Sequence, residues 1–283
     1  MKLWKRKEWI LQQICKAYNR YYMCIIGNNG VLPVRPIPTQ RVLEKLDEHL
    51  GRNDYDSAER HLLYWLDEAK DGRDKHGMLT VENELMGLYR KTNRKENALE
   101  SVRKALNLID ELKLGSAVVA GTTFTNAATV YKAFAMPEES IELFEKAKEI
   151  YEKELQSDDP RLGGLYNNLG LTLTDLKRFD EAEEYYNKAI NVMSINKNGE
   201  LEIAITYLNL CDLNEAKLGS EQSEKIIDEY IEKAYELLNR DYLPRNGYYA
   251  FVCEKCAPTF GYFGRFLYQK ELSDRARCIY ERN

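Results

Sequence analysis

Residues 160–193 read PRLGGLYNNLGLTLTDLKRFDEAEEYYNKAINVM, and this stretch decides the fold. Two sets of apolar or small residues recur in it at spacings of three and four: Tyr166, Leu169, Gly170 and Leu173, then Ala182, Tyr186 and Ala189. Such spacings place each set on one face of a helix, with a turn at residues 177–179 between them. Gly170 and Ala182 are small where two helix axes would approach closely. The stretch therefore predicts two packed helices.

The same plan recurs along the chain with a period near 42 residues. Small residues equivalent to Ala182 are Ser140, Ala98 and Ala58, at separations of 42, 42 and 40 residues. A larger apolar residue follows each of the four after four positions, and these residues are Tyr186, Phe144, Val102 and Leu62. Beyond residue 200, a first helix is matched by Tyr207, Leu210 and Cys211, whereas Ile227, Ile231 and Ala234 arrive about four residues late. We therefore expect an insertion near residues 219–223.

A final unit follows the same plan at the carboxyl end of the sequence. Its matching residues are Phe260, Phe263, Gly264, Leu267, Ala276 and Tyr280. Pro258 would lie early in the first helix of this unit. Residues 246–256 could then be a separate turn, a kinked extension or part of that helix, because proline interrupts the helical hydrogen-bond pattern.

The stretch 160–193 resembles the tetratricopeptide repeat, whose pattern is aromatic-x2-Leu-Gly-x2-Tyr followed by Ala-x3-aromatic-x2-Ala. Leu173 stands where that family usually has a tyrosine. A period near 42 is longer than the commoner period of about 34. It resembles the repeats of kinesin light chains and of bacterial peptide-responsive regulators.

This resemblance covers residues 39–283 and implies an all-α fold, a right-handed α-α superhelix or solenoid of about six antiparallel helix pairs. The expected repeats are 39–72, 78–113, 117–156, 160–195, 200–240 and 246–283. The resemblance also implies a scaffold or adaptor, not an enzyme, that binds a protein or an extended peptide in a concave groove. The alternative is a peptide-responsive signalling regulator whose superhelix changes conformation when the ligand binds.

Residues 1–38 precede the repeats as a separate region. Apolar residues recur there at helical spacing, namely Leu3, Ile10, Ile14, Ala17, Tyr18, Tyr21 and Ile25, and three prolines follow at positions 33, 36 and 38. Residues 1–20 hold six cations and one acid, a net charge of +5, although the whole chain has a net charge of -5. We expect a basic amphipathic helix over residues 3–25 that packs on the repeats, followed by an extended linker.

The overall composition argues against nucleic-acid and membrane partners. An acidic remainder and a single basic helix are a weak footprint for nucleic acid. No stretch approaches the roughly 20 apolar residues that a membrane helix needs. The six cysteines fall mostly within helical patterns, which favours a reducing, cytoplasmic location. The sequence leaves the oligomeric state open.

No motif for catalysis is present in the sequence. It has no P-loop, no Gly-x-Ser-x-Gly elbow and no His-Glu-x-x-His. Cys253, Cys256 and Cys278 could be small apolar fillers, a redox pair or three zinc ligands, but a second cysteine pair or a nearby histidine is missing. We therefore expect no catalytic residue, no metal and no cofactor, and a packing role for these thiols.

The resemblance assigns certain positions of each first helix to the inner, concave surface. Asn126, Asn168 and Asn209 share one such position at separations of 42 and 41 residues. A ladder of amides can bind the backbone of an extended peptide, because each amide both donates and accepts. The alternative is that each asparagine bonds a neighbouring helix. The candidate ligand-binding residues are Asn83, Arg90, Asn126, Thr129, Lys132, Asn167, Asn168, Asp175, Asn209, Asp212 and Arg265.

Overall fold

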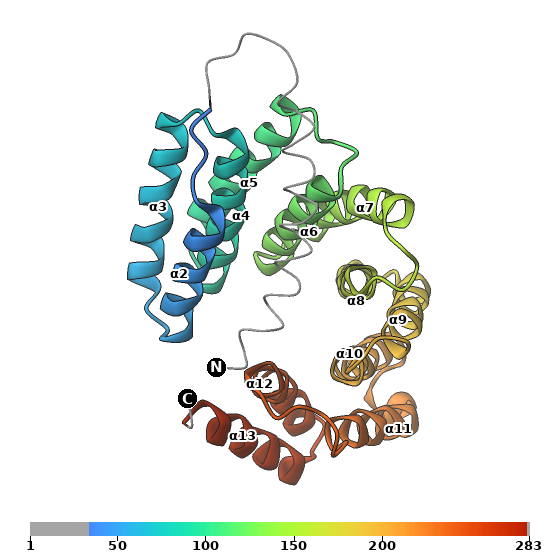
Figure 1. Ribbon diagram of the computed structural model, residues 1–283. Helices are drawn as coiled ribbons and strands as arrows, with labels where there is room; N and C mark the ends of the chain where they lie inside the picture. The colour runs from blue at the N-terminus through green and yellow to red at the C-terminus, as the bar shows by residue number, and fades with distance from the viewer. Residues whose placement is uncertain (1–33, 282–283) are drawn as a thin grey trace. The chain divides into compact units, whose positions relative to one another are not determined.

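The computed structural model describes residues 34–281. The helix expected over residues 3–25 therefore lies outside the described residues. Within them the chain forms twelve α-helices (Figure 1). Their bounds are α2 Thr39–Gly51, α3 Tyr55–Asp71, α4 Lys75–Lys91, α5 Lys95–Glu111, α6 Val118–Ala133, α7 Pro137–Glu154, α8 Pro160–Asp175, α9 Phe179–Ser194, α10 Glu200–Leu218, α11 Ser220–Leu238, α12 Gly247–Tyr262 and α13 Phe266–Tyr280.

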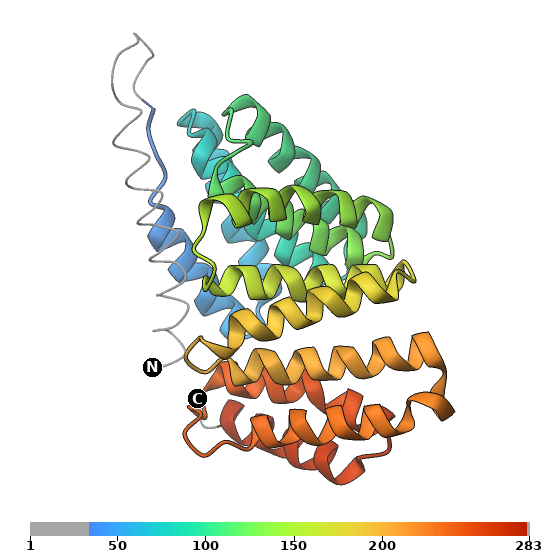
Figure 2. The same ribbon diagram turned by 90° about the vertical axis from the view of Figure 1, so that its right-hand side faces the viewer.

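The described residues divide into two compact units between Glu154 and Leu155. The amino-terminal unit, residues 34–154, holds the pairs α2–α3, α4–α5 and α6–α7, and the carboxy-terminal unit, residues 155–281, holds α8–α9, α10–α11 and α12–α13. In the amino-terminal unit α4 packs on α3, and α6 packs on both α4 and α5. In the carboxy-terminal unit α10 packs on α8 and α9, and α12 packs on α10. The second view shows paired helices side by side and antiparallel (Figure 2).

The small residues that set the period are the contact points within the pairs. Ala58, Ala98, Ser140 and Ala182 each lie fourth in a second helix, and all four are completely buried. Gly170 on α8 faces Tyr186 on α9 so closely that a Cβ at position 170 would lie 2.5 Å from the tyrosine ring. The predicted all-α architecture of stacked helix pairs is thus confirmed, with the small residues where the pattern placed them.

The insertion expected in the fifth pair is absent, and that prediction is wrong. Helix α10 is 19 residues long, against 16 for α8, and the single residue Gly219 joins it to α11. Gly219 has φ +80°, which favours glycine. Ser223 is fourth in α11 and completely buried, so it takes the place that Ala182 has in α9. Ser223 follows Ala182 by 41 residues, so the period is kept, and the delay was apparent because Ile227, four residues later, was aligned in place of Ser223.

The last pair also differs from the expected alignment. Residues 247–256 belong to the first helix, because the Asn246 side chain accepts a hydrogen bond from the Tyr249 backbone N–H at 3.1 Å and begins α12. Pro258 lies in the carboxyl-terminal half of this helix, not early in it. Gly264 lies in the turn to α13, with φ +77°, and Leu267 is 82% exposed. The residues 263–267 therefore do not form a packed helix face.

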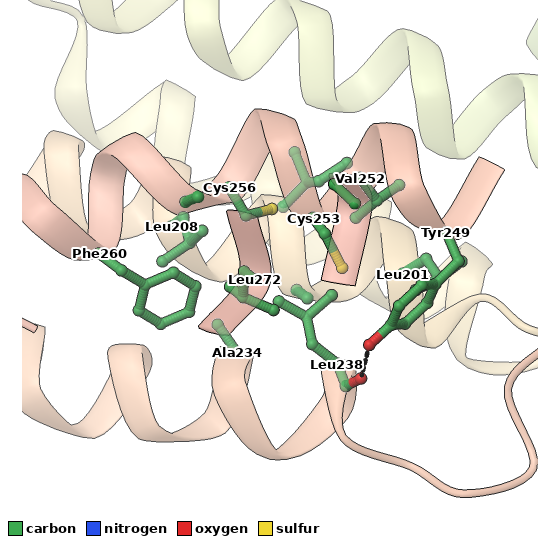
Figure 3. Packing of buried hydrophobic residues seen from close by; sticks show 14 of the residues in the cluster. Leu201, Leu208, Ala234, Leu238, Tyr249, Val252, Cys253, Cys256, Phe260 and Leu272 are labelled. Atoms are coloured by element: carbon green, nitrogen blue, oxygen red, sulfur yellow. Dashed lines mark hydrogen bonds between the residues drawn. The ribbon is translucent and has the colours of Figure 1, made fainter. Parts of the chain in front are cut away.

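The core of the carboxy-terminal unit explains two of the cysteines. Cys253 and Cys256 on α12 point into an apolar cluster that includes Leu201, Phe260 and Leu272 (Figure 3). Tyr249, fully buried in the same cluster, donates its hydroxyl hydrogen to the Leu238 carbonyl at 2.9 Å.

Among residues 34–281, no helix is long and apolar enough to cross a membrane.

Candidate functional site

The predicted ligand-binding residues lie mainly on the first helices of four pairs. Helix α4 carries Asn83 and Arg90, α6 carries Asn126, Thr129 and Lys132, α8 carries Asn167, Asn168 and Asp175, and α10 carries Asn209 and Asp212. Arg265 lies apart from these helices, at the amino-terminal cap of α13. The residues on α4 and α6 belong to the amino-terminal unit and those on α8 and α10 to the carboxy-terminal unit.

In the amino-terminal unit the asparagines of adjacent first helices bind each other. The Asn126 amide donates to Asn83 Oδ1 at 2.9 Å. Asn83 in turn donates to the Thr123 hydroxyl at 3.1 Å and to the Leu79 carbonyl at 2.9 Å. Both asparagines are half-buried, and the Asn126 carbonyl oxygen is not used in these bonds. These bonds join α4 to α6, which agrees with the alternative that each asparagine binds a neighbouring helix. The Asn126 carbonyl oxygen can still accept a hydrogen bond from a ligand.

The carboxy-terminal unit repeats this arrangement with a different asparagine than expected. Asn209 on α10 donates to Asn167 Oδ1 on α8 at 3.0 Å. Asn168, which the sequence pattern aligned with Asn126 and Asn209, is half-buried, and its side chain has no hydrogen-bond partner within residues 34–281. Asn167, and not Asn168, therefore binds the asparagine of the next first helix. The prediction that aligned Asn168 with Asn126 and Asn209 is wrong by one residue for this bond. A step of one residue turns a side chain by about 100° around a helix, so only one neighbour can face α10.

Two carboxylates lie towards the carboxyl ends of the same first helices. Asp175 is the last residue of α8, and Asp212 lies on α10; both are exposed. Loss of hydration among the surrounding protein atoms, with help from the Glu215 carboxylate, raises the pKa of Asp212 to about 6. The Asp212 carboxylate is thus exposed to solvent and yet partly dehydrated by the protein atoms around it. Burial, with smaller contributions from Asp212 and Asp175, raises the pKa of Tyr186.

The corresponding residues of the amino-terminal unit are basic. Arg90 lies in the last turn of α4 and Lys132 in the last turn of α6. Cations at the carboxyl end of a helix are favoured by the helix dipole, whereas an acid such as Asp175 is disfavoured there. Burial lowers the pKa of Arg90, although its side chain is exposed. The Thr129 hydroxyl donates to the Thr125 carbonyl at 2.8 Å, which ties it to its own helix.

Arg265 does not line an inner first-helix surface, and its assignment there is corrected. Its guanidinium lies 2.6 Å from the Asp228 carboxylate and 3.7 Å from Glu232, both on α11. The cause is the position of the turn: α12 ends at Tyr262, so residue 265 precedes a second helix. Arg265 therefore joins the second helices of the last two pairs.

Three polar residues near these positions were not among the candidates. Tyr262, the last residue of α12, is 70% exposed and donates to Glu215 on α10 at 2.9 Å. Thr123 supports Asn83, as described above. The separation of Glu215 and Tyr262, 47 positions, departs from the period near 42, so the sequence pattern gave no signal for this bond. Thr123 gave no signal either, since a threonine within an apolar helix is typical of ordinary packing.

The three cysteines are not gathered around one point. Cys253 and Cys256 are buried, whereas Cys278 is exposed on α13. Burial raises the pKa of Cys253 to about 11 and that of Cys256 to about 12, so both thiols are protonated at neutral pH and poor nucleophiles. Within the described part of the chain, no group of three histidines, cysteines or acids is placed to hold a metal ion. The expectation that the thiols bind no metal stays a prediction.

Comparison with known proteins agrees with this architecture. Residues 119–195 match the profile of a family described as Tetratricopeptide repeat. The predicted tetratricopeptide repeats are thereby confirmed, and they make up this part of the chain. No curated protein matches the sequence.

Solved structures show the same fold at low sequence identity. A Podosopora anserina protein described as a kinesin light chain with nearly identical TPR-like repeats is 16% identical, with a TM-score of 0.51 over 71% of this chain and 94% of that chain. PilW, a type IV pilus biogenesis factor, is 14% identical, with a TM-score of 0.53 over 88% and 96%. The pilF protein of Pseudomonas aeruginosa is 15% identical, with a TM-score of 0.50 over 86% and 92%. At these identities the likeness concerns the fold alone.

Proposed function

We propose that the protein is a non-enzymatic scaffold that binds a partner protein or extended peptide on the inner surface of its first helices. The observation that carries this proposal is the row of polar groups on α8 and α10. Asn168 has no partner among the described residues, and Asp212 is an exposed carboxylate whose pKa is raised to about 6 by partial loss of hydration. An amide without a hydrogen-bond partner and a partly dehydrated carboxylate gain most from a ligand. Folding has already removed part of the water around them, so less water remains to be displaced on binding.

The ligand fits this surface best if it carries a basic residue next to an extended backbone. Asn168 offers donors and an acceptor to a peptide bond, and Asp212 with Asp175 offers negative charge. Asp175 is the last residue of α8, where the helix dipole does not favour an acid. The regulator alternative requires a second site for a regulated partner, and no particular feature of the described residues favours it.

A library of linear peptides displayed on phage tests the proposal directly. We expect the full chain to select peptides with lysine or arginine, and we expect Asn168→Ala to weaken their binding about fivefold, corresponding to about 1 kcal/mol. Asp212→Asn should weaken the same peptides and reduce the fall in affinity below pH 6. Ile195→Ala is a matched surface control, because Ile195 is 68% exposed and lies outside the first helices. Selection of peptides whose affinity is unchanged by Asn168→Ala and Asp212→Asn would refute this surface as the site.

A further inference from the structure

Helix α3 presents an outward stripe with two exposed apolar side chains. Leu63 is 41% exposed and Tyr64 is 57% exposed. With Val34, 44% exposed, they are the only large apolar side chains of that exposure in residues 34–154. Tyr64 rests edge-on against Trp65, with ring centroids 5.2 Å apart. Exposed apolar residues of this unit are thus concentrated on its first pair and on the chain that enters it.

The chain enters this unit beside the carboxyl end of α3. The Arg35 backbone N–H donates to the Gly72 carbonyl at 3.0 Å, and the Ile37 N–H donates to Asp74 Oδ2 at 2.9 Å. Gly72 is pressed against this segment, since a Cβ there would lie 2.3 Å from the Arg35 carbonyl oxygen. These contacts fix Val34 next to the turn that follows α3.

This anchor keeps the preceding residues within reach of the stripe. Tyr64 is seven residues before Asp71, the end of α3, which corresponds to about 11 Å along the helix axis. Residues 26–33 alone can span up to about 26 Å when extended. A segment tied so closely has a high effective concentration at α3, so even modest contacts hold it there.

The sequence that precedes Val34 is complementary to this stripe in apolar residues and in charge. Residues 3–25 carry a recurring apolar set that includes Ile10, Ile14 and Tyr18, and residues 1–20 have a net charge of +5. Helix α3 has five acids, at positions 56, 59, 67, 68 and 71, against Arg60 and Lys70, a net charge of -3. Its exposed stripe includes Asp56, Asp67 and Asp71 beside Leu63 and Tyr64. Apolar residues and charges of opposite sign are therefore available on the two sides.

We propose that the outward stripe of α3 around Leu63 and Tyr64 is the docking surface for residues 3–25 of the same chain. The apolar set covers Leu63 and Tyr64, and the cations of residues 1–20 face the acids of α3. This interaction is separate from the inner surface of the first helices and does not depend on the proposed function.

Tryptophan fluorescence of the full chain tests this inference. The protein has three tryptophans, Trp4, Trp9 and Trp65, so a Trp65→Phe background leaves two reporters in the segment. In that background we expect blue-shifted emission that resists a soluble quencher. Leu63→Lys with Tyr64→Lys should shift the emission to the red and increase quenching. The matched control is Leu267→Lys, which adds charge at an 82% exposed leucine in the other unit and should change neither quantity.

Three outcomes would overturn the inference. Emission in the Trp65→Phe background equal to that of the denatured protein would show that the segment is not covered. A blue shift that survives the double substitution would place the segment elsewhere, and a shift that disappears on dilution would assign it to a second copy. Because both substituted side chains are exposed, circular dichroism should show unchanged helix content. If it does not, Asp67→Lys and Asp71→Lys provide the same test through charge, with a red shift expected and an unchanged emission as the contrary result.

Discussion

The two units share one way of joining their first helices and differ in the charges placed beside that joint. In the amino-terminal unit Asn126 binds Asn83, and in the carboxy-terminal unit Asn209 binds Asn167, at 2.9 and 3.0 Å. Arg90 and Lys132 lie in the last turns of the helices next to the first pair of asparagines, whereas Asp175 and Asp212 lie on the helices of the second pair, with Lys217 in the last turn of α10. Buried or half-buried amide links belong to the repeat, whereas the charges vary from unit to unit. Charges are therefore the better guide to what each unit recognises.

The largest expected effect tests whether the units are energetically separate. Tyr186→Ala empties a completely buried position against Gly170 and should lower the free energy of unfolding of the carboxy-terminal unit by about 3 to 5 kcal/mol. Phe144→Ala is the matching change in the amino-terminal unit, where Phe144 is also completely buried. Amide hydrogen exchange should show lost protection mainly in the substituted unit. Equal loss in both units would mean that they unfold together.

A second prediction concerns a buried acid found only in the amino-terminal unit. Glu82 is 2% exposed, one of its carboxylate oxygens has no hydrogen-bond partner, and Lys104 lies 4.0 Å from the other. Burial raises the pKa of Glu82 above its ordinary value of 4.5, despite a hydrogen bond with Ser101. Folding then favours the protonated acid, so stability is full below the ordinary value and falls as the pH rises through the folded-state pKa.

Glu82→Gln should remove this pH dependence. At pH 7 we expect the variant to be more stable than the parent by about 1 to 2 kcal/mol, because the neutral amide avoids burial of a charge. Thermal unfolding between pH 4 and pH 8 measures the effect, and the two proteins should converge at the acidic end. Glu96→Gln, at an exposed glutamate in the adjacent helix α5, is the control. A variant destabilised at pH 7 would show that Glu82 is paired more strongly than its contacts indicate.

Adjacent asparagines in α8 allow a sharper comparison. Asn167→Ala removes the acceptor of the Asn209 amide and should cost about 1 kcal/mol of stability. Asn168→Ala removes a side chain without a partner in the described residues and should change stability by less than about 0.5 kcal/mol. Urea denaturation of both variants decides between these roles. Equal destabilisation would mean that Asn168 also joins helices, which would remove the main support for a ligand site there.

The smallest expected effect lies in the turns. Lys177, between α8 and α9, has φ +59°, whereas Asn53 and Asn93 occupy the equivalent turns of the other unit with φ +54° and +56°. Asparagine adopts this left-handed conformation more readily than lysine. Lys177→Asn should therefore raise stability by about 0.5 kcal/mol, measured as a small rise in the unfolding temperature. Lys188→Asn, within α9, should lower it instead.

The sequence predicted those features of the fold that recur with the repeat period, and it failed for features that occur once. Ala58, Ala98, Ser140 and Ala182 repeat at nearly constant separation, so the helix pairs followed from them. Ser223 keeps this period, 41 residues after Ala182, but the apolar residues Ile227 and Ile231 gave a stronger signal and were aligned four residues out of register. Gly264 was placed in a helix because Phe263-Gly264 imitates Leu169-Gly170, yet its positive φ belongs to a turn.

The sequence predicted the residue types of the candidate site and the helices that carry them. It did not predict how each helix is rotated about its own axis, which decides the direction of each side chain. Asn167 and Asn168 are equivalent in sequence, and only the orientation of α8 relative to α10 determines which one binds Asn209. The fate of Arg265 depended in the same way on where α12 ends. Orientation of this kind arises from packing across tens of residues, and a single sequence carries little trace of it.

Stacking of each helix pair on the next has a consequence for how each unit loses its structure. Where contacts run mainly between neighbouring pairs, the stability of a unit depends on the interface between each pair and the next. Opening can then spread from one pair to the next, and it can halt where the interface between two pairs is strong. Each unit can consequently release one pair at a time while the remaining pairs stay folded.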